Sequence, residues 1–161
     1  MKRMCMGVVA TAALSMGQGV LAQVNEKFAD LEPEIQLVRS MAQTARKDVV
    51  AANMVLSAEE SQGFWPVYTQ YRTDVAAVQD KRVKVITDYG ATYLTLTDAD
   101  ARKLVNEYMK YQAAALKVRE RYVGKFAKVL PDTKVMRFFQ IENRLDALTD
   151  LVIAHDMPLS K

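Results

Sequence analysis

The side chains able to do chemistry in this chain are few, and its single histidine is the first to consider. His155 is the only histidine among 161 residues, and a histidine-based triad or zinc site would need partner residues that the sequence lacks. Its position near the end of a predicted helix suits a cation, because the carboxyl end of a helix is the negative end of its dipole. We therefore interpret His155 as a surface or helix-capping residue.

Pairs of acidic residues are a second candidate, because general acid–base chemistry uses carboxylates. A glycosidase-type site needs two carboxylates that face each other across a cleft. The paired acids here are instead close neighbours at expected helix ends or on helix surfaces, so we interpret them as capping and solvated residues. The phosphate-binding, zinc-protease, serine-hydrolase and CxxC motifs are also absent. We expect no enzymatic activity, no cofactor and no metal. The acidic pairs are Glu59 with Glu60, Asp98 with Asp100, and Asp146 with Asp150.

Several polar residues fall within or beside predicted apolar stripes. Arg82, Gln112 and Arg119 occupy such positions, and Arg137 and Glu142 flank the stripe of the last predicted helix. A long side chain there commonly extends its charged end to water. A buried arginine–glutamate pair that fixes helix register is a second interpretation, and a ligand site is a third.

An aromatic cluster is most simply part of the core, with contact to a partner as an alternative. Phe64, Tyr68 and Tyr71 share one helical stripe, which favours a core position. Trp65 points off that stripe. If Trp65 is exposed with Val67 or Tyr71 beside it, the group would form a protein-binding patch.

Long stretches of helical periodicity position these residues, and no strand-type alternation competes with them. Ser57 and Glu60 form a capping box at the start of the second predicted helix, in which Pro66 predicts a bend. Asp98 and Asp100 follow Thr97 at the start of the third. Short loops make successive helices antiparallel neighbours. The predicted class is all-α, as elongated antiparallel hairpins or a four-helix bundle. The predicted helices cover residues 33–52, 58–90, 98 onward and 131–154.

The third predicted helix carries two apolar stripes, which predicts contact with more than one neighbouring helix. The first stripe holds Leu104, Tyr108, Tyr111, Ala115, Val118 and Tyr122. The second holds Val105, Met109, Leu116, Val123 and Phe126.

The first 22 residues have the pattern of a secretory signal peptide, with Lys2 and Arg3 before an apolar run and small residues up to Ala22. The apolar run is short for a membrane anchor, so we expect cleavage, a single helical domain over residues 23–161 and no stable membrane span. Removing Lys2 and Arg3 lowers the formal charge from +3 to +1, which argues against nucleic-acid binding. The only cysteine, Cys5, would also be removed.

Two helix starts and three further segments resemble known exported proteins. The starts resemble the Leu-Thr-x-x-Gln motifs of the Spy/CpxP-like periplasmic proteins, with Glu60 and Asp100 in place of the glutamine. The further segments are similar to a group of small exported proteobacterial proteins. The starts are Leu56-Ser57-Ala58-Glu59-Glu60 and Leu96-Thr97-Asp98-Ala99-Asp100. The segments are Phe64-Trp65-Pro66-Val67-Tyr68, Val129-Leu130-Pro131 and Arg137-Phe138-Phe139-Gln140-Ile141-Glu142-Asn143.

The resemblance to Spy/CpxP-like proteins implies an all-α, often dimeric periplasmic protein that acts as an ATP-independent chaperone or envelope-stress modulator. The metal ligands of some relatives do not map onto this sequence. We therefore expect a periplasmic binding protein whose partners are unfolded or envelope proteins, with a homodimer as one form. The alternative is a sensor or structural subunit for one specific protein partner. The candidate binding or register-fixing residues are Trp65, Tyr71, Arg82, Arg119, Arg137 and Glu142.

Overall fold

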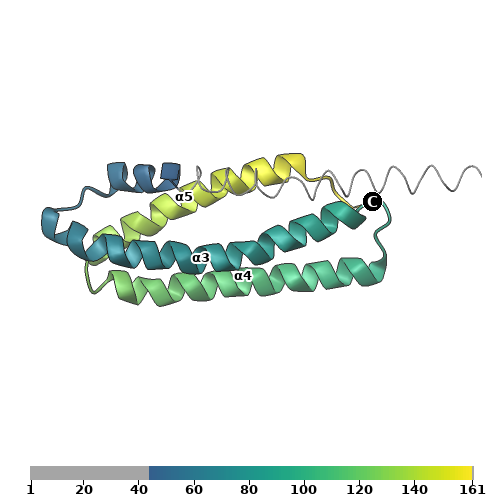
Figure 1. Ribbon diagram of the computed structural model, residues 1–161, viewed down its shortest axis with the longest axis horizontal. Coiled ribbons are helices and arrows are strands. Elements are labelled where there is room, and N and C mark those ends of the chain that lie inside the picture. Colours follow the sequence, from purple (N-terminus) through teal and green to yellow (C-terminus); the bar gives the residue numbers. More distant parts are fainter. Residues whose placement is uncertain (1–43, 161) are drawn as a thin grey trace, which may run out of the picture. The chain divides into compact units, whose positions relative to one another are not determined.

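The computed structural model of the chain describes residues 44–160 and consists of helices joined by short loops (Figure 1). Helical residues 44–54 are followed by α3 (Ala58–Thr92), α4 (Asp98–Phe126) and α5 (Asp132–Asp156), and none of the described residues lies in a strand. The predicted all-α class is confirmed. The predicted signal peptide and the start of the first predicted helix lie outside the described residues.

Local sequence signals set the starts of α3 and α4. Ser57 Oγ accepts a hydrogen bond from the Glu60 amide at 3.1 Å, and the Glu60 carboxylate accepts one from the Ser57 amide at 2.7 Å. This is the predicted capping box. At the next helix start, Thr97 Oγ accepts from the Asp100 amide at 3.2 Å. Pro66 lies inside α3, and the helix continues on both sides of it.

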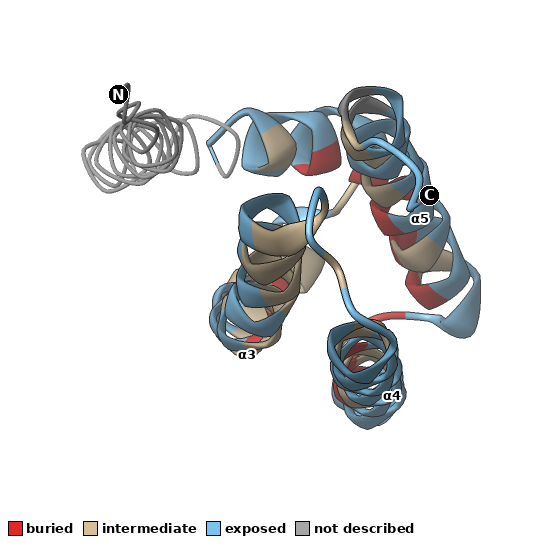
Figure 2. Ribbon diagram, turned by 90° about the vertical axis from the view of Figure 1, so that its right-hand side faces the viewer, coloured by how far each residue is buried: buried red, intermediate tan, exposed pale blue. Residues whose placement is uncertain are grey.

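Successive helices run in opposite directions, because the loops that join them are only a few residues long (Figure 1). α3 and α4 lie side by side as a long hairpin, and α3 alone has 35 residues, which corresponds to roughly 50 Å. Ion pairs connect α5 to both helices of this hairpin. Figure 2 shows α3, α4 and α5 placed around a shared interior.

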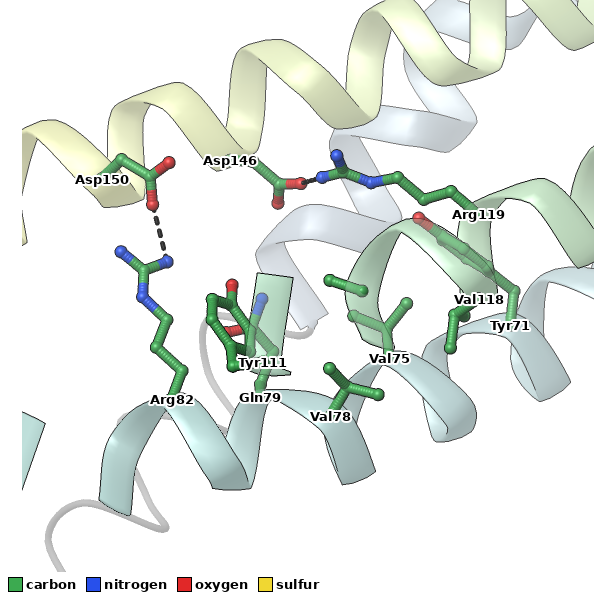
Figure 3. Close-up of a pocket in the computed structure, with 11 residues that line it drawn as sticks. Tyr71, Val75, Val78, Gln79, Arg82, Tyr111, Val118, Arg119, Asp146 and Asp150 are labelled. Atoms are coloured by element: carbon green, nitrogen blue, oxygen red, sulfur yellow. Dashed lines mark hydrogen bonds and ion pairs between the residues drawn. The ribbon is translucent and has the colours of Figure 1, made fainter. Parts of the chain in front are cut away.

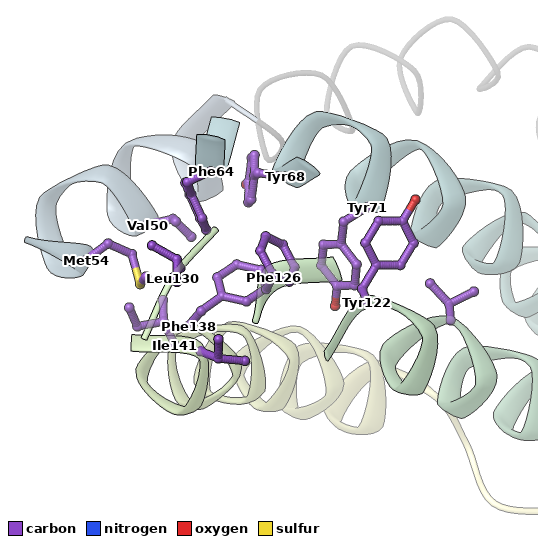
Figure 4. Close-up of a cluster of buried hydrophobic side chains, with 12 residues drawn as sticks. Val50, Met54, Phe64, Tyr68, Tyr71, Tyr122, Phe126, Leu130, Phe138 and Ile141 are labelled. Atoms are coloured by element: carbon purple, nitrogen blue, oxygen red, sulfur yellow. The ribbon is translucent and has the colours of Figure 1, made fainter. Parts of the chain in front are cut away.

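The hydrophobic core lies near the loops at 55–57 and 127–131, where aromatic rings pack against one another (Figure 4). Phe126 and Phe138 have ring centroids 4.4 Å apart, and Phe64 lies 5.5 Å from Phe138. Such pairs stabilise a core beyond the area that they bury. Gly63 permits the close approach of α3 to the second loop, because a Cβ atom there would lie 3.0 Å from Val129 Cβ.

α4 contacts both α3 and α5, as its two stripes predicted, but one of its apolar faces is largely uncovered among the described residues. Of the second stripe, Phe126 alone is buried. The other four side chains, which we call the α4 stripe, are exposed: Val105 by 55%, Met109 by 55%, Leu116 by 56% and Val123 by 46%. The first stripe does face the core, where Tyr111, Val118 and Tyr122 are buried. Periodicity marked both faces correctly as apolar, but the packing covers one of them.

Candidate functional site

Three acidic residues on α5 form a row that organises the polar interior. Glu142, Asp146 and Asp150 are each four residues apart, so they lie on one face of the helix at steps of about one turn. Their partners are arginines from the other helices. We call this arrangement the interior ion-pair network. Its members are Arg46, Arg72, Arg82, Arg119, Glu142, Asp146 and Asp150.

Glu142 is the most deeply buried member of the interior ion-pair network. Its side chain is 1% exposed, and Oε2 accepts from Arg46 Nη1 at 2.9 Å and from Arg72 Nη1 at 3.1 Å. Its other oxygen, Oε1, is buried and accepts no hydrogen bond within the described chain. Glu142 therefore sits in a buried arginine–glutamate arrangement of the kind considered from the sequence, although its partners lie 96 and 70 residues away.

Asp146 links two more helices through the same network. Arg46 Nη2 donates to Oδ1 of Asp146 at 2.7 Å, and Arg119 of α4 donates to Oδ2. The prediction that Asp146 lies on a solvated face is wrong, because its side chain is 23% exposed and held by two guanidinium groups. Asp150 is 57% exposed, as predicted for a solvated acid, and it pairs with Arg82 of α3 at 2.6 Å. The acids of α5 thus contact all of the other described helices.

The pKa values of three of these arginines are raised by their neighbours. Burial lowers the pKa of Arg46, but the charges of Glu142 and Asp146 outweigh that effect, so the pKa is raised overall. The pKa of Arg119 is raised in the same way, with burial opposed mainly by Asp146. For Arg82, burial is outweighed by the hydrogen bond to Asp150. The network therefore links the helices through directional contacts between charged side chains.

A small pocket lies between α3, α4 and α5, with part of the network on its wall (Figure 3). Arg82 and Arg119 reach across it to Asp150 and Asp146, while Tyr71 and Tyr111 line its sides. Its volume is about 50 Å³. Pockets for small-molecule ligands typically hold about 300–1,000 Å³. This space therefore fits a few water molecules rather than a metabolite.

The groups in this pocket are poorly suited to catalysis. Asp146 and Asp150 are already paired with guanidinium groups, so each has an oxygen engaged in an ion pair. Burial, followed by the charge of Glu142, raises the pKa of Tyr71, so its hydroxyl stays protonated at neutral pH. The lining contains no serine, threonine, cysteine or histidine to act as a nucleophile with a neighbouring base. The arrangement fits a structural role.

The remaining candidate residues are separated from this pocket or buried in the core. Arg137 is exposed, and its Nε–H donates to the Asn53 carbonyl at 2.6 Å, at the end of helical residues 44–54. Trp65 is half-buried, with its ring 5.0 Å from Phe64 and the Lys47 ammonium 5.5 Å from its centroid. Tyr71 is 1% exposed. Tyr71 therefore lies in the core with Phe64 and Tyr68, as their shared stripe favoured, and it is not available for an exposed patch beside Trp65.

Sequence reasoning missed both arginines that contact Glu142. Arg46 and Arg72 come from helices far apart in the chain, so no local pattern joins them to Glu142. One local signal was available, since acids at positions 142, 146 and 150 repeat with helical spacing beside the apolar stripe of α5. This spacing would have indicated a row of carboxylates that pair with basic side chains, but it does not specify which basic side chains these are.

Comparisons with known proteins identify no family and no relative of this chain. No protein-family model matches the chain, and neither a curated protein nor a solved structure was found to match it. Among residues 44–160, no helix combines the length and the apolar character needed to cross a membrane. The clearest surface feature of the described chain is the α4 stripe, four large apolar side chains on one helix with no covering element.

Proposed function

We propose that this protein works by binding other proteins through the α4 stripe and makes or breaks no covalent bond. The exposure of Val105, Met109, Leu116 and Val123 on one face of α4 carries the proposal. Water contact with large apolar side chains is unfavourable, and a row of them on one face is typical of a protein-interaction surface. Most of α4 is drawn as exposed in Figure 2.

The leading candidate within this proposal is an exported, periplasmic ATP-independent chaperone or envelope-stress modulator. Its support is the resemblance of the two helix starts to Spy/CpxP-like proteins together with the basic residues near the stripe. Arg102 and Lys117 are exposed on α4, close in sequence to Val105 and Leu116. An apolar row with cations beside it can hold unfolded segments, because such segments expose both apolar and acidic side chains.

The second candidate is a sensor or structural subunit that binds one specific protein. It is favoured by the confinement of the α4 stripe to a single helix face, which suits one helical partner better than many irregular clients. Both candidates use the same side chains. They differ in the breadth of partners, which an experiment can measure directly.

The test is aggregation of reduced lysozyme, followed by light scattering with increasing amounts of the purified protein and no ATP. Suppression that is lost in Leu116→Glu supports chaperone binding at the α4 stripe. The matched control is Leu148→Glu, because Leu148 on α5 is 61% exposed, similar to Leu116, and lies outside the stripe. Equal suppression by both variants would contradict the role of the stripe.

If the protein does not suppress aggregation, a pull-down from the cell envelope separates the remaining possibilities. A specific-partner protein should capture one protein that Leu116→Glu fails to capture and Leu148→Glu retains. If every protein captured by the parent is also captured by Leu116→Glu, the proposal that the α4 stripe binds protein is refuted.

A further inference from the structure

We propose that a second site, on α5 beside the end of helical residues 44–54, binds a phosphate monoester group between Arg137 and Arg144. The site shares no residue with the α4 stripe, so it is independent of the proposed function. The lining of a second pocket, the charge balance there and the spacing of the two arginines support this site.

The second pocket lies where the end of helical residues 44–54 meets α5. The hydrogen bond of 2.6 Å from Arg137 Nε to the Asn53 carbonyl joins its two sides. All of the lining residues except Ile141 are exposed, so the pocket opens to solvent. Its volume of about 210 Å³ is below the range of about 300–1,000 Å³ that holds a whole small-molecule ligand, so it suits one polar group of a ligand. The lining residues are Asn53, Arg137, Gln140, Ile141 and Arg144.

The positive charge of this pocket is not balanced by its own lining. Two of its five lining residues are arginines, and none is acidic. The pocket between α3, α4 and α5 differs, because Asp146 and Asp150 line it together with its arginines. Of the eight arginines in residues 44–160, five pair with a described carboxylate, and Arg102, Arg137 and Arg144 do not. Two of these three line the same pocket, which therefore attracts an anion.

Helical spacing brings the polar side chains of this pocket to one face of α5. Arg137, Gln140 and Arg144 follow one another at steps of three and four residues, so they lie on the same side of the helix. About 10 Å along the axis separates the two arginines, with Gln140 between them. The Nε–H of Arg137 donates to the Asn53 carbonyl, which holds this side chain in place and leaves its two terminal nitrogens to face a ligand. Neither Arg144 nor Gln140 donates a hydrogen bond to another described residue.

Two guanidinium groups at one pocket favour a phosphate monoester over a single carboxylate. One guanidinium group can already bind both oxygens of a carboxylate through two parallel hydrogen bonds. A phosphate monoester has three terminal oxygens and close to two negative charges at neutral pH, so it can engage both arginines and the Gln140 amide together. The remainder of the ligand extends into solvent, because the pocket is small and open. Soluble phosphate esters and lipid headgroups both carry such a group.

NMR titration of the purified protein with inorganic phosphate tests the site through the Nε–H signals of its arginines. We expect the signals of Arg137 and Arg144 to shift saturably with a Kd of about 1 mM, as for a few exposed charge-assisted hydrogen bonds. Arg144→Gln should raise this Kd by about tenfold, and it should fold normally because Arg144 bonds to no described residue. The matched control is Arg102→Gln, because Arg102 is an exposed arginine of α4 without a carboxylate partner in the described chain. This control should leave the Kd within about twofold of the parent value.

The absence of a saturable shift at the two arginines overturns the site, as does equal weakening of phosphate binding by Arg144→Gln and Arg102→Gln. Acetate or succinate that binds as tightly as phosphate overturns the assignment of a phosphate group. Glycerol 3-phosphate and vesicles that contain phosphatidic acid then separate the two sources of the group. Vesicle binding that is lost in Arg144→Gln assigns a lipid headgroup, whereas binding of glycerol 3-phosphate alone assigns a soluble ester.

Discussion

Replacing Glu142 with alanine should lower the free energy of unfolding by about 3 kcal/mol. Removing one partner of a buried ion pair generally costs about 3–5 kcal/mol, because the remaining charge is left uncompensated. Glu142 Oε2 accepts from both Arg46 and Arg72, whose side chains are 11% and 20% exposed. Arg46 keeps its contact with Asp146, and Arg72 can turn toward water, so the lower end of the range applies. Oε1 accepts no hydrogen bond within the described chain and adds nothing to the loss.

The assay is urea unfolding followed by the circular dichroism of the helices, with the slope m compared between variants. Asp150→Ala is the matched control, because Asp150 is also an acid on α5 paired with an arginine. Its side chain is 57% exposed, whereas that of Glu142 is 1% exposed. An exposed pair of this kind contributes about 0–1 kcal/mol. The two variants should therefore differ by about 2 kcal/mol or more.

Equal losses in the two variants, or a loss below about 1 kcal/mol for Glu142→Ala, would refute the reasoning. Such a result would mean that the arginines relax to other partners or to water when the carboxylate is removed. The interior ion-pair network would then be a consequence of helix packing and would not determine the register.

Two further predictions concern helix packing and alkaline pH. Gly124→Ala should raise the free energy of unfolding by about 0.5–1 kcal/mol, since Gly124 has open space around it. Gly63→Ala should be about 1–3 kcal/mol less stable than Gly124→Ala, because its methyl group meets Val129. Burial, followed by the hydrogen bond to Asp74, raises the pKa of Tyr122 from 10.0 to about 12. Because the folded-state pKa is raised, the stabilisation is complete below pH 10 and is lost as the pH rises toward 12. The urea midpoint of the parent chain should therefore exceed that of Tyr122→Phe by a smaller amount above pH 10 than below it. A difference in midpoint that stays constant across this pH range would contradict this account.

Features that depend on residues within about one helical turn could be predicted from the amino-acid sequence. Ser57 with Glu60, and Thr97 with Asp100, cap helices through contacts three residues apart, so the starts of α3 and α4 could be predicted from their side chains alone. The helical periodicity likewise gave the all-α class, because it arises from the repeat of the helix itself.

The packing of the helices against one another sets which apolar faces are covered and which charged side chains form pairs. The two stripes of α4 have the same periodicity, yet Val118 is 4% exposed and Leu116 is 56% exposed. In the described chain, other helices pack against the first stripe and, of the second stripe, only against Phe126. Glu142 contacts Arg46 across 96 residues of sequence, a separation at which no local spacing specifies a partner. A helical pattern fixes the direction in which a side chain points from its own axis, whereas burial and ion pairing depend on what the rest of the chain brings to that side.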